Sequence, residues 1–99
     1  MEYLEELFAS NTYFENKILY VIKEFEKLFI NALNKKGIEN EGDQELFTVL
    51  ANKVKKNYPE LESRIEQVII YYGEEKDTEE KLYYMMKLYA LIKEKIENN

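Results

Sequence analysis

Apolar side chains recur every three or four residues along most of the chain, the spacing that gathers them on one face of an α-helix. The longest run predicts a helix over residues 13–34. Its apolar positions are Phe14, Ile18, Val21, Ile22, Phe25, Leu28, Phe29, Ala32 and Leu33. We expect this helix to end before Gly37, because glycine suits the left-handed residue that often follows a helix C-terminus.

The start of this helix has two interpretations. Thr12 and Glu15 have the spacing of a capping box, in which two side chains satisfy free backbone N–H groups at a helix start. Residues 2–9 would then form a separate short helix. The apolar stripe also continues in phase through Leu4, Leu7 and Asn11, which is typical of one unbroken helix.

A second helix is predicted over residues 44–57. A polar loop over residues 38–42 precedes it, and Asp43 has the position of an N-cap, whose side chain accepts a hydrogen bond from the first helical turn. The apolar positions of this helix are Leu46, Phe47, Val49, Leu50 and Val54.

Pro59 indicates the boundary of a third helix, over residues 60–72, because proline lacks the N–H group that the first helical residue would leave unpaired. Gly73 closes this helix. Its apolar positions are Leu61, Ile65, Val68, Ile69 and Tyr72.

The last helix is predicted over residues 78–97, behind a capping signature formed by Asp77 and Glu80. Its main apolar stripe consists of Leu82, Met85, Met86, Tyr89, Ile92 and Ile96. A second stripe, Tyr84, Leu88 and Leu91, lies on a neighbouring face. Because this apolar band is wider than one contact requires, either the helix is central in the fold or one face meets another subunit.

These elements predict an all-α fold, an antiparallel four-helix bundle with an optional short N-terminal helix, in one domain over residues 1–99. The chain has only three glycines and one proline, and all lie between the periodic segments. Connections of about 3–9 residues favour antiparallel neighbours.

The charge of the chain narrows the choice of partners. Lysine and arginine total 14 residues against 20 aspartates and glutamates, a net charge of −6. Such a surface repels phosphate, which disfavours a general nucleic-acid partner. The lysine clusters, Lys35–Lys36 and Lys53 with Lys55 and Lys56, are interpreted as charges near helix C-termini and on a solvated face.

The location of the protein is also predicted from its composition. No run of about 18 apolar residues occurs, so we expect no membrane-spanning helix and no membrane partner. The acidic residues 1–6 differ from the basic start of a signal peptide. The chain has no cysteine and therefore no disulfide. We expect a cytoplasmic protein.

The residue types present exclude common catalytic machinery. With no histidine and no cysteine, the chain cannot form a Ser-His-Asp or Cys-His arrangement or supply a thiolate metal ligand. No glycine-rich phosphate-binding loop is present. The acidic side chains lie opposite the apolar stripes, which indicates a solvated face rather than a metal site. We therefore predict no catalytic, cofactor-binding or metal-binding residue and no enzyme activity.

Nine tyrosines stand out in a chain of this size. Most are explained by packing in the core or at its boundary. Tyrosine is also enriched at protein interfaces, where its ring is buried and its hydroxyl stays in contact with water. Stacking on nucleobases is opposed by the acidic charge. The candidate interface residues are Tyr84, Leu88, Leu91, Tyr71 and Tyr83.

Over residues 13–96 the order of features resembles HEPN domains, small helical bundles that accompany minimal nucleotidyltransferases or act as RNases in toxin–antitoxin systems. The resemblance rests on the end of the long helix at residues 25–38, on residues 44–51, on Tyr58-Pro59-Glu60-Leu61, on Tyr71-Tyr72 and on the acid-capped last helix.

Catalytic members of that family carry an Arg-x(4–6)-His motif. The only arginine here is Arg64 and there is no histidine, so no RNase site is transferred. The resemblance then implies a non-catalytic member with a dimerising or partner-binding role.

Three functional hypotheses follow. The first is a non-catalytic protein–protein interaction module that forms a homodimer. The second is an accessory, substrate-positioning partner of a minimal nucleotidyltransferase in a toxin–antitoxin-type system. The third is a bundle that binds a small apolar ligand between its helices.

Overall fold

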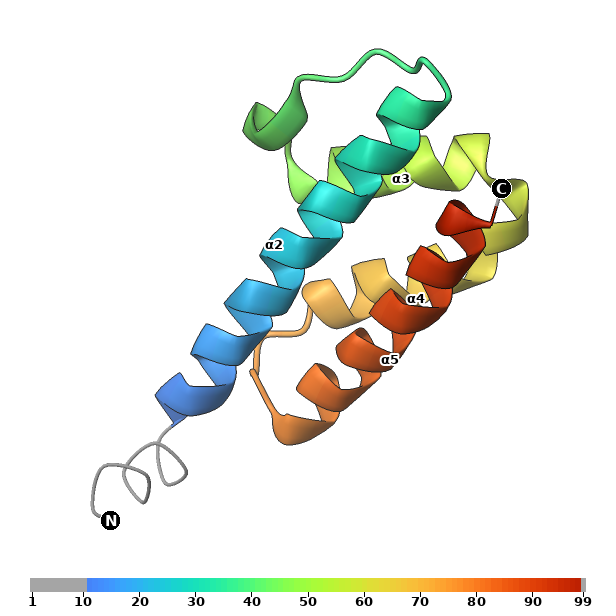
Figure 1. Cartoon of the computed structure of the whole chain (residues 1–99). Coiled ribbons are helices and arrows are strands. Elements are labelled where there is room, and N and C mark those ends of the chain that lie inside the picture. The colour runs from blue at the N-terminus through green and yellow to red at the C-terminus, as the bar shows by residue number, and fades with distance from the viewer. Residues whose placement is uncertain (1–10, 99) are drawn as a thin grey trace.

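The computed structural model describes residues 11–98, and within them four long helices form one bundle (Figure 1). The helices are α2 (Asn11–Lys35), α3 (Phe47–Asn57), α4 (Glu62–Tyr72) and α5 (Glu79–Glu97). Two 3-10 turns, η1 (Gly42–Gln44) and η2 (Pro59–Leu61), precede α3 and α4. No strand occurs in this part of the chain, so the predicted all-α four-helix bundle is confirmed.

Helix direction follows from the length of each connection. The short connections make α3 and α4 antiparallel, and likewise α4 and α5 (Figure 1). The longer connection between α2 and α3 runs back over α2, so α3 crosses α2 and both end at the same side of the molecule. Two lysines fix this end: Lys35 Nζ donates to the carbonyl of Ile96 (2.8 Å), and Lys36 Nζ donates to the carbonyl of Asn57 (2.5 Å).

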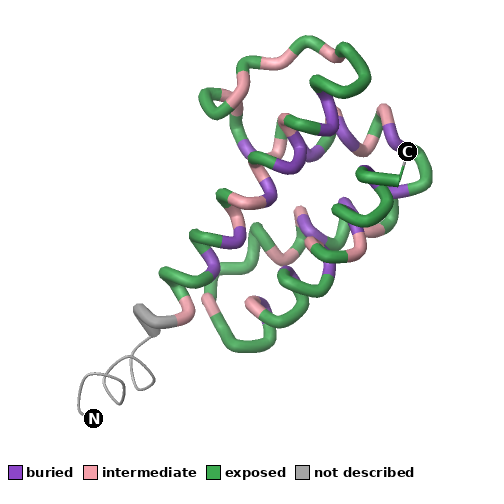
Figure 2. Tube along the Cα trace, in the orientation of Figure 1, coloured by how far each residue is buried: buried purple, intermediate pink, exposed green. Residues whose placement is uncertain are grey.

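The core forms where the apolar faces of the four helices meet (Figure 2). At its centre the Phe25 ring lies edge-on to Tyr89 of α5 (5.3 Å between ring centroids) and to Phe47 of α3 (6.4 Å). Helix α5 packs against both α2 and α4 of its own chain, so the wide apolar band is explained by a central helix. The other buried core residues are Ile18, Val21, Leu28, Phe29, Ala32, Leu33, Leu50, Ala51, Val54, Tyr58, Leu61, Ile65, Val68, Met85, Leu88, Ile92 and Ile96.

Helix α2 ends before Gly37, as the sequence predicts. Gly37 has a positive φ of 69°, its N–H donates to the carbonyl of Asn34 (3.1 Å), and the N–H of Ile38 donates to the carbonyl of Leu33 (2.9 Å). These two bonds form a Schellman motif, and Ile38 packs against the core as the accompanying apolar contact.

The predicted starts of three helices, α2, α3 and α5, need correction. Thr12 lies inside α2, so its capping role is wrong; residues 2–9 fall outside the described residues. Asp43 is not the N-cap of α3, because α3 begins only at Phe47 and Leu46 holds the cap position. Side chains of the preceding loop account for this: Asn40 accepts the N–H of Gly42, and Glu45 accepts the N–H of Glu41, which stabilises a turn there instead of a first helical turn.

The N-cap of α5 is Thr78 rather than Asp77. The Thr78 hydroxyl accepts the N–H of Lys81 (3.1 Å), and the helix starts at Glu79. Asp77 instead pairs with the ammonium of Lys81 (3.0 Å), which also donates to the carbonyl of Glu74 (2.9 Å). Lys81 is buried, with 3% exposure, and ties the α4–α5 connection to the first turn of α5.

The other lysine cluster also makes local contacts. Lys53 pairs with Glu45, and this hydrogen bond, together with the N–H of Glu41, holds the pKa of the Glu45 carboxyl below its ordinary value despite partial desolvation. Lys55 pairs with Glu66 of α4 at 3.6 Å.

Some predicted stripe positions are not buried. Leu46 is 71% exposed because it precedes α3, and Met86 is 55% exposed because it lies on the outer side of α5. Every helix within residues 11–98 is too short or too polar to span a membrane.

Candidate functional site

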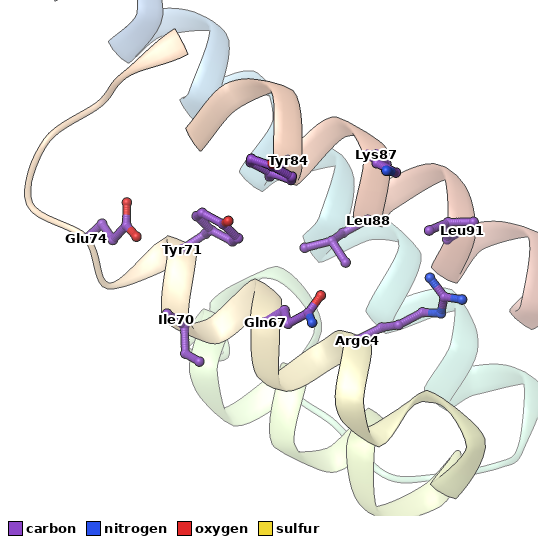
Figure 3. A pocket seen from close by; sticks show the side chains of 9 residues that line it. All are labelled: Arg64, Gln67, Ile70, Tyr71, Glu74, Tyr84, Lys87, Leu88 and Leu91. Carbon is purple, nitrogen blue, oxygen red and sulfur yellow. The ribbon is translucent and has the colours of Figure 1, made fainter. Parts of the chain in front are cut away.

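A groove runs between α4 and α5 and is the main candidate site (Figure 3). It encloses about 530 Å³. We call it the α4–α5 groove and define it by its lining residues: Arg64, Gln67, Ile70, Tyr71, Glu74, Tyr84, Lys87, Leu88 and Leu91. The lining positions repeat every three or four residues, so each helix contributes one continuous face.

The groove gathers the candidate interface residues from two separate segments. Tyr71 comes from α4, and Tyr84, Leu88 and Leu91 come from α5. The fifth candidate, Tyr83, does not line the groove, but its ring lies edge-on to Tyr84 with 5.4 Å between centroids. Tyr83 is 60% exposed, so the apolar surface continues from the groove onto the outer side of α5.

The candidates differ in how far a partner can reach them. Leu88 is only 6% exposed and belongs to the core, so it forms the floor of the groove. Tyr84 is exposed, and Tyr71 and Leu91 are half-buried. Docking would therefore involve the tyrosine rings and Leu91, whereas Leu88 holds the two helices together.

The two tyrosines of the groove are stacked. Their ring centroids lie 5.5 Å apart and their planes are inclined by 11°. Desolvation raises the pKa of the Tyr71 hydroxyl, and Tyr84, Glu80 and Glu74 add smaller effects in the same direction. The Tyr71 phenol therefore stays neutral at physiological pH, and the two stacked rings present flat, amphipathic surfaces.

Charges divide the groove into two ends. Figure 3 shows Glu74 beside Tyr71 at one end and Arg64 at the other, with the Arg64 side chain extending toward Leu91. Lys87 lies on the Arg64 half, on the side of α5 away from α4. Within residues 11–98, neither Arg64 nor Lys87 forms an ion pair or a side-chain hydrogen bond.

Sequence reasoning missed the polar lining of the groove. Arg64 and Gln67 share a helical face with Tyr71, at spacings of three and four residues, and Glu74 continues this spacing just past the helix end. Exposed charges recur on the outer face of any helix, so this pattern alone does not mark a site. Only the tertiary structure places α5 beside this face of α4.

The groove contains groups that can bind a partner. It offers phenol, guanidinium, amide, ammonium and carboxylate groups beside apolar side chains, which supports stacking, apolar contact and ion pairing. Across residues 11–98, no three histidine, cysteine, aspartate or glutamate side chains lie close enough together to hold a metal ion.

A second apolar hollow lies between α2 and α5. Tyr20, Val21, Glu24, Met86 and Tyr89 line it, and it encloses about 260 Å³. It is smaller than the α4–α5 groove and, apart from Glu24, its lining carries no charge. It therefore offers apolar contact but little to select a partner.

Comparisons with protein-family models, curated proteins and solved structures returned no match for this chain.

Proposed function

We propose that this chain is a non-catalytic interaction module that associates with a second copy of itself through the α4–α5 groove. The observation that carries the proposal is the pairing of Tyr71 and Tyr84, two stacked rings beside Leu91, on a surface that residues 11–98 leave uncovered. Aromatic residues are enriched at protein interfaces, because they contribute large contact areas at a small cost in side-chain entropy.

Exposed apolar side chains next to the groove extend this surface. Ile70 is 63% exposed, and Tyr83 flanks Tyr84 on the outer side of α5. Contiguous exposed apolar surface of this kind, bordered by polar residues, marks interaction sites in many proteins. The absence of histidine and cysteine from the whole sequence supports a binding role rather than acyl-transfer or thiol chemistry.

Sedimentation velocity at micromolar concentrations tests the proposal. We expect a dimer for the native chain and a shift to monomer for Tyr83→Glu and Tyr84→Glu, because each change buries a charge in the proposed interface. Tyr20→Glu is the control, since Tyr20 on α2 is about as exposed as Tyr83 and lies outside the groove.

Helical circular dichroism of each variant separates dissociation from unfolding. A strictly monomeric native chain at these concentrations would contradict the homodimer. A dimer that Tyr20→Glu dissociates while Tyr83→Glu and Tyr84→Glu leave it intact would move the contact to the α2–α5 hollow.

A further inference from the structure

The α4–α5 groove is electrically bipolar. Arg64 and Glu74, the latter just past the end of α4, mark its two ends on the α4 side, and the ten residue steps from one to the other correspond to about 15 Å along a helix. Lys87 adds a positive charge to the Arg64 half, while Glu80 lies close enough to Tyr71 to raise the pKa of its hydroxyl. One half of the groove is therefore basic and the other acidic.

The two charged side chains at the ends of the groove have no ion-pair partner within the described residues. The side chains of Arg64 and Glu74 form no ion pair in residues 11–98, although other acidic and basic side chains do, such as Lys55 with Glu66. Arg64 is half-buried, its side chain extends toward Leu91 (Figure 3), and it is the only arginine of a chain with a net charge of −6. A half-buried guanidinium without an anionic partner loses hydration that an incoming carboxylate would replace.

A bipolar groove is complementary to a copy of itself in one orientation. In a face-to-face dimer, a two-fold axis that runs across the groove at right angles to its helices reverses the groove end for end. The basic end of each copy then faces the acidic end of the other. A two-fold axis along the groove would instead place Arg64 on Arg64 and Glu74 on Glu74.

This inference rests on the proposed function and specifies its geometry. We infer that two copies associate through their α4–α5 grooves in that antiparallel arrangement, with Arg64 of each copy paired to Glu74 of the other. Tyr71, Tyr84 and Leu91 supply the apolar contact between the two ion pairs. Gln67 lies near the middle of the groove, and in this register it faces Tyr71 of the other copy, whose hydroxyl its amide can bind as donor or acceptor.

A charge-swap experiment tests this pairing. Arg64→Glu turns both ion pairs of the dimer into Glu–Glu repulsions, and Glu74→Lys turns both into Arg–Lys repulsions. Each single variant should raise the dimer Kd about tenfold or more, since two attractive contacts become repulsive. Because these contacts are partly screened, the increase should shrink at high salt.

The decisive sample is an equimolar mixture of the two single variants. In the mixed dimer, the Glu introduced at position 64 of one copy faces the Lys introduced at position 74 of the other. In the second contact, native Arg64 faces native Glu74. Both ion pairs are restored, so native mass spectrometry should show the heterodimer in excess over both homodimers. The double variant Arg64→Glu with Glu74→Lys should likewise regain the native Kd.

Matched controls keep the result specific. Lys23→Glu and Glu41→Lys make the same charge changes at exposed positions on α2 and in the α2–α3 connection, and they should leave the Kd nearly unchanged. An unchanged Kd in both groove variants, or no preference for the heterodimer, overturns the antiparallel pairing while the proposed self-association stands. A native chain that never dimerises overturns both.

Discussion

At the scale of single residues, buried polar groups are matched one by one. In the last turn of α2 the N–H of Lys36 donates to the carbonyl of Leu33 (3.1 Å). The carbonyl of Ala32 accepts a hydrogen bond from the hydroxyl of Tyr58, in a different part of the chain (2.9 Å). Tyr58 is fully buried, and burial raises the pKa of its hydroxyl. The same ring lies under the Lys36 ammonium, 3.9 Å from its centroid.

Tyr58→Phe should therefore destabilise the protein by about 1–2 kcal/mol, because it removes the donor and leaves a buried carbonyl unpaired while the ring still fills its space. Urea unfolding followed by circular dichroism measures the change. Tyr20→Phe is the control and should shift the midpoint little, since the Tyr20 ring is exposed. Equal midpoints for the native chain and Tyr58→Phe would show that the hydrogen bond contributes nothing.

Sequence patterns did not indicate these contacts. Tyr58 and Ala32 are separated by 26 residues, and no local spacing links them. Lys81 is similar: its four-residue spacing from Asp77 suits a surface pair, but the Glu74 carbonyl and the packing of the connection are what bury it.

At the scale of elements, helix ends were predicted better than helix starts. Gly37 ends α2 because the Schellman motif requires a residue in the left-handed conformation. Glycine adopts this conformation readily, so the helix end could be predicted from the sequence. Several residues near each helix start can serve as caps, so Asp43 and Asp77 were plausible candidates. The loop contacts of Asn40 and Glu45, and the hydroxyl of Thr78, decided those starts.

Two glycines with different backbone conformations give a matched test of this idea. Gly37→Ala should cost about 1–2 kcal/mol, because its φ of 69° strains any residue with a Cβ atom. Gly73→Ala should change stability little, since Gly73 has a φ of −80° and an added Cβ would meet only ordinary van der Waals contacts at 3.5 Å. Thermal unfolding of both variants provides the comparison, and similar losses in Tm would contradict the role assigned to Gly37.

At the scale of the whole molecule, α5 links the core to the candidate interface. Its second stripe is shared between the two: Leu88 packs in the core, Leu91 is half-buried, and Tyr84 is exposed. A charge at Leu88 would therefore unfold the chain rather than merely separate two copies, which is why the association tests use Tyr83 and Tyr84.

Leu88→Ala should lower the free energy of unfolding by about 2–5 kcal/mol, the usual cost of a cavity at a buried leucine. That is a large part of the stability of a domain this size, which is typically about 5–15 kcal/mol. Met86→Ala is the neighbouring control and should cost much less, because Met86 is exposed. Chemical denaturation measures both values; a small loss for Leu88→Ala would mean that Leu88 is not held in the core.

The sequence by itself determined the helices, their apolar faces and the glycine end of α2, because those features depend on residues within one or two turns of each other. The tertiary structure decided which face of α5 is covered by residues 11–98. It brought Tyr71 to Tyr84 and placed Arg64 and Glu74, whose side chains form no ion pair within those residues, at opposite ends of one groove. Helical periodicity is a local property, whereas the pairing of faces depends on how all four helices share one core.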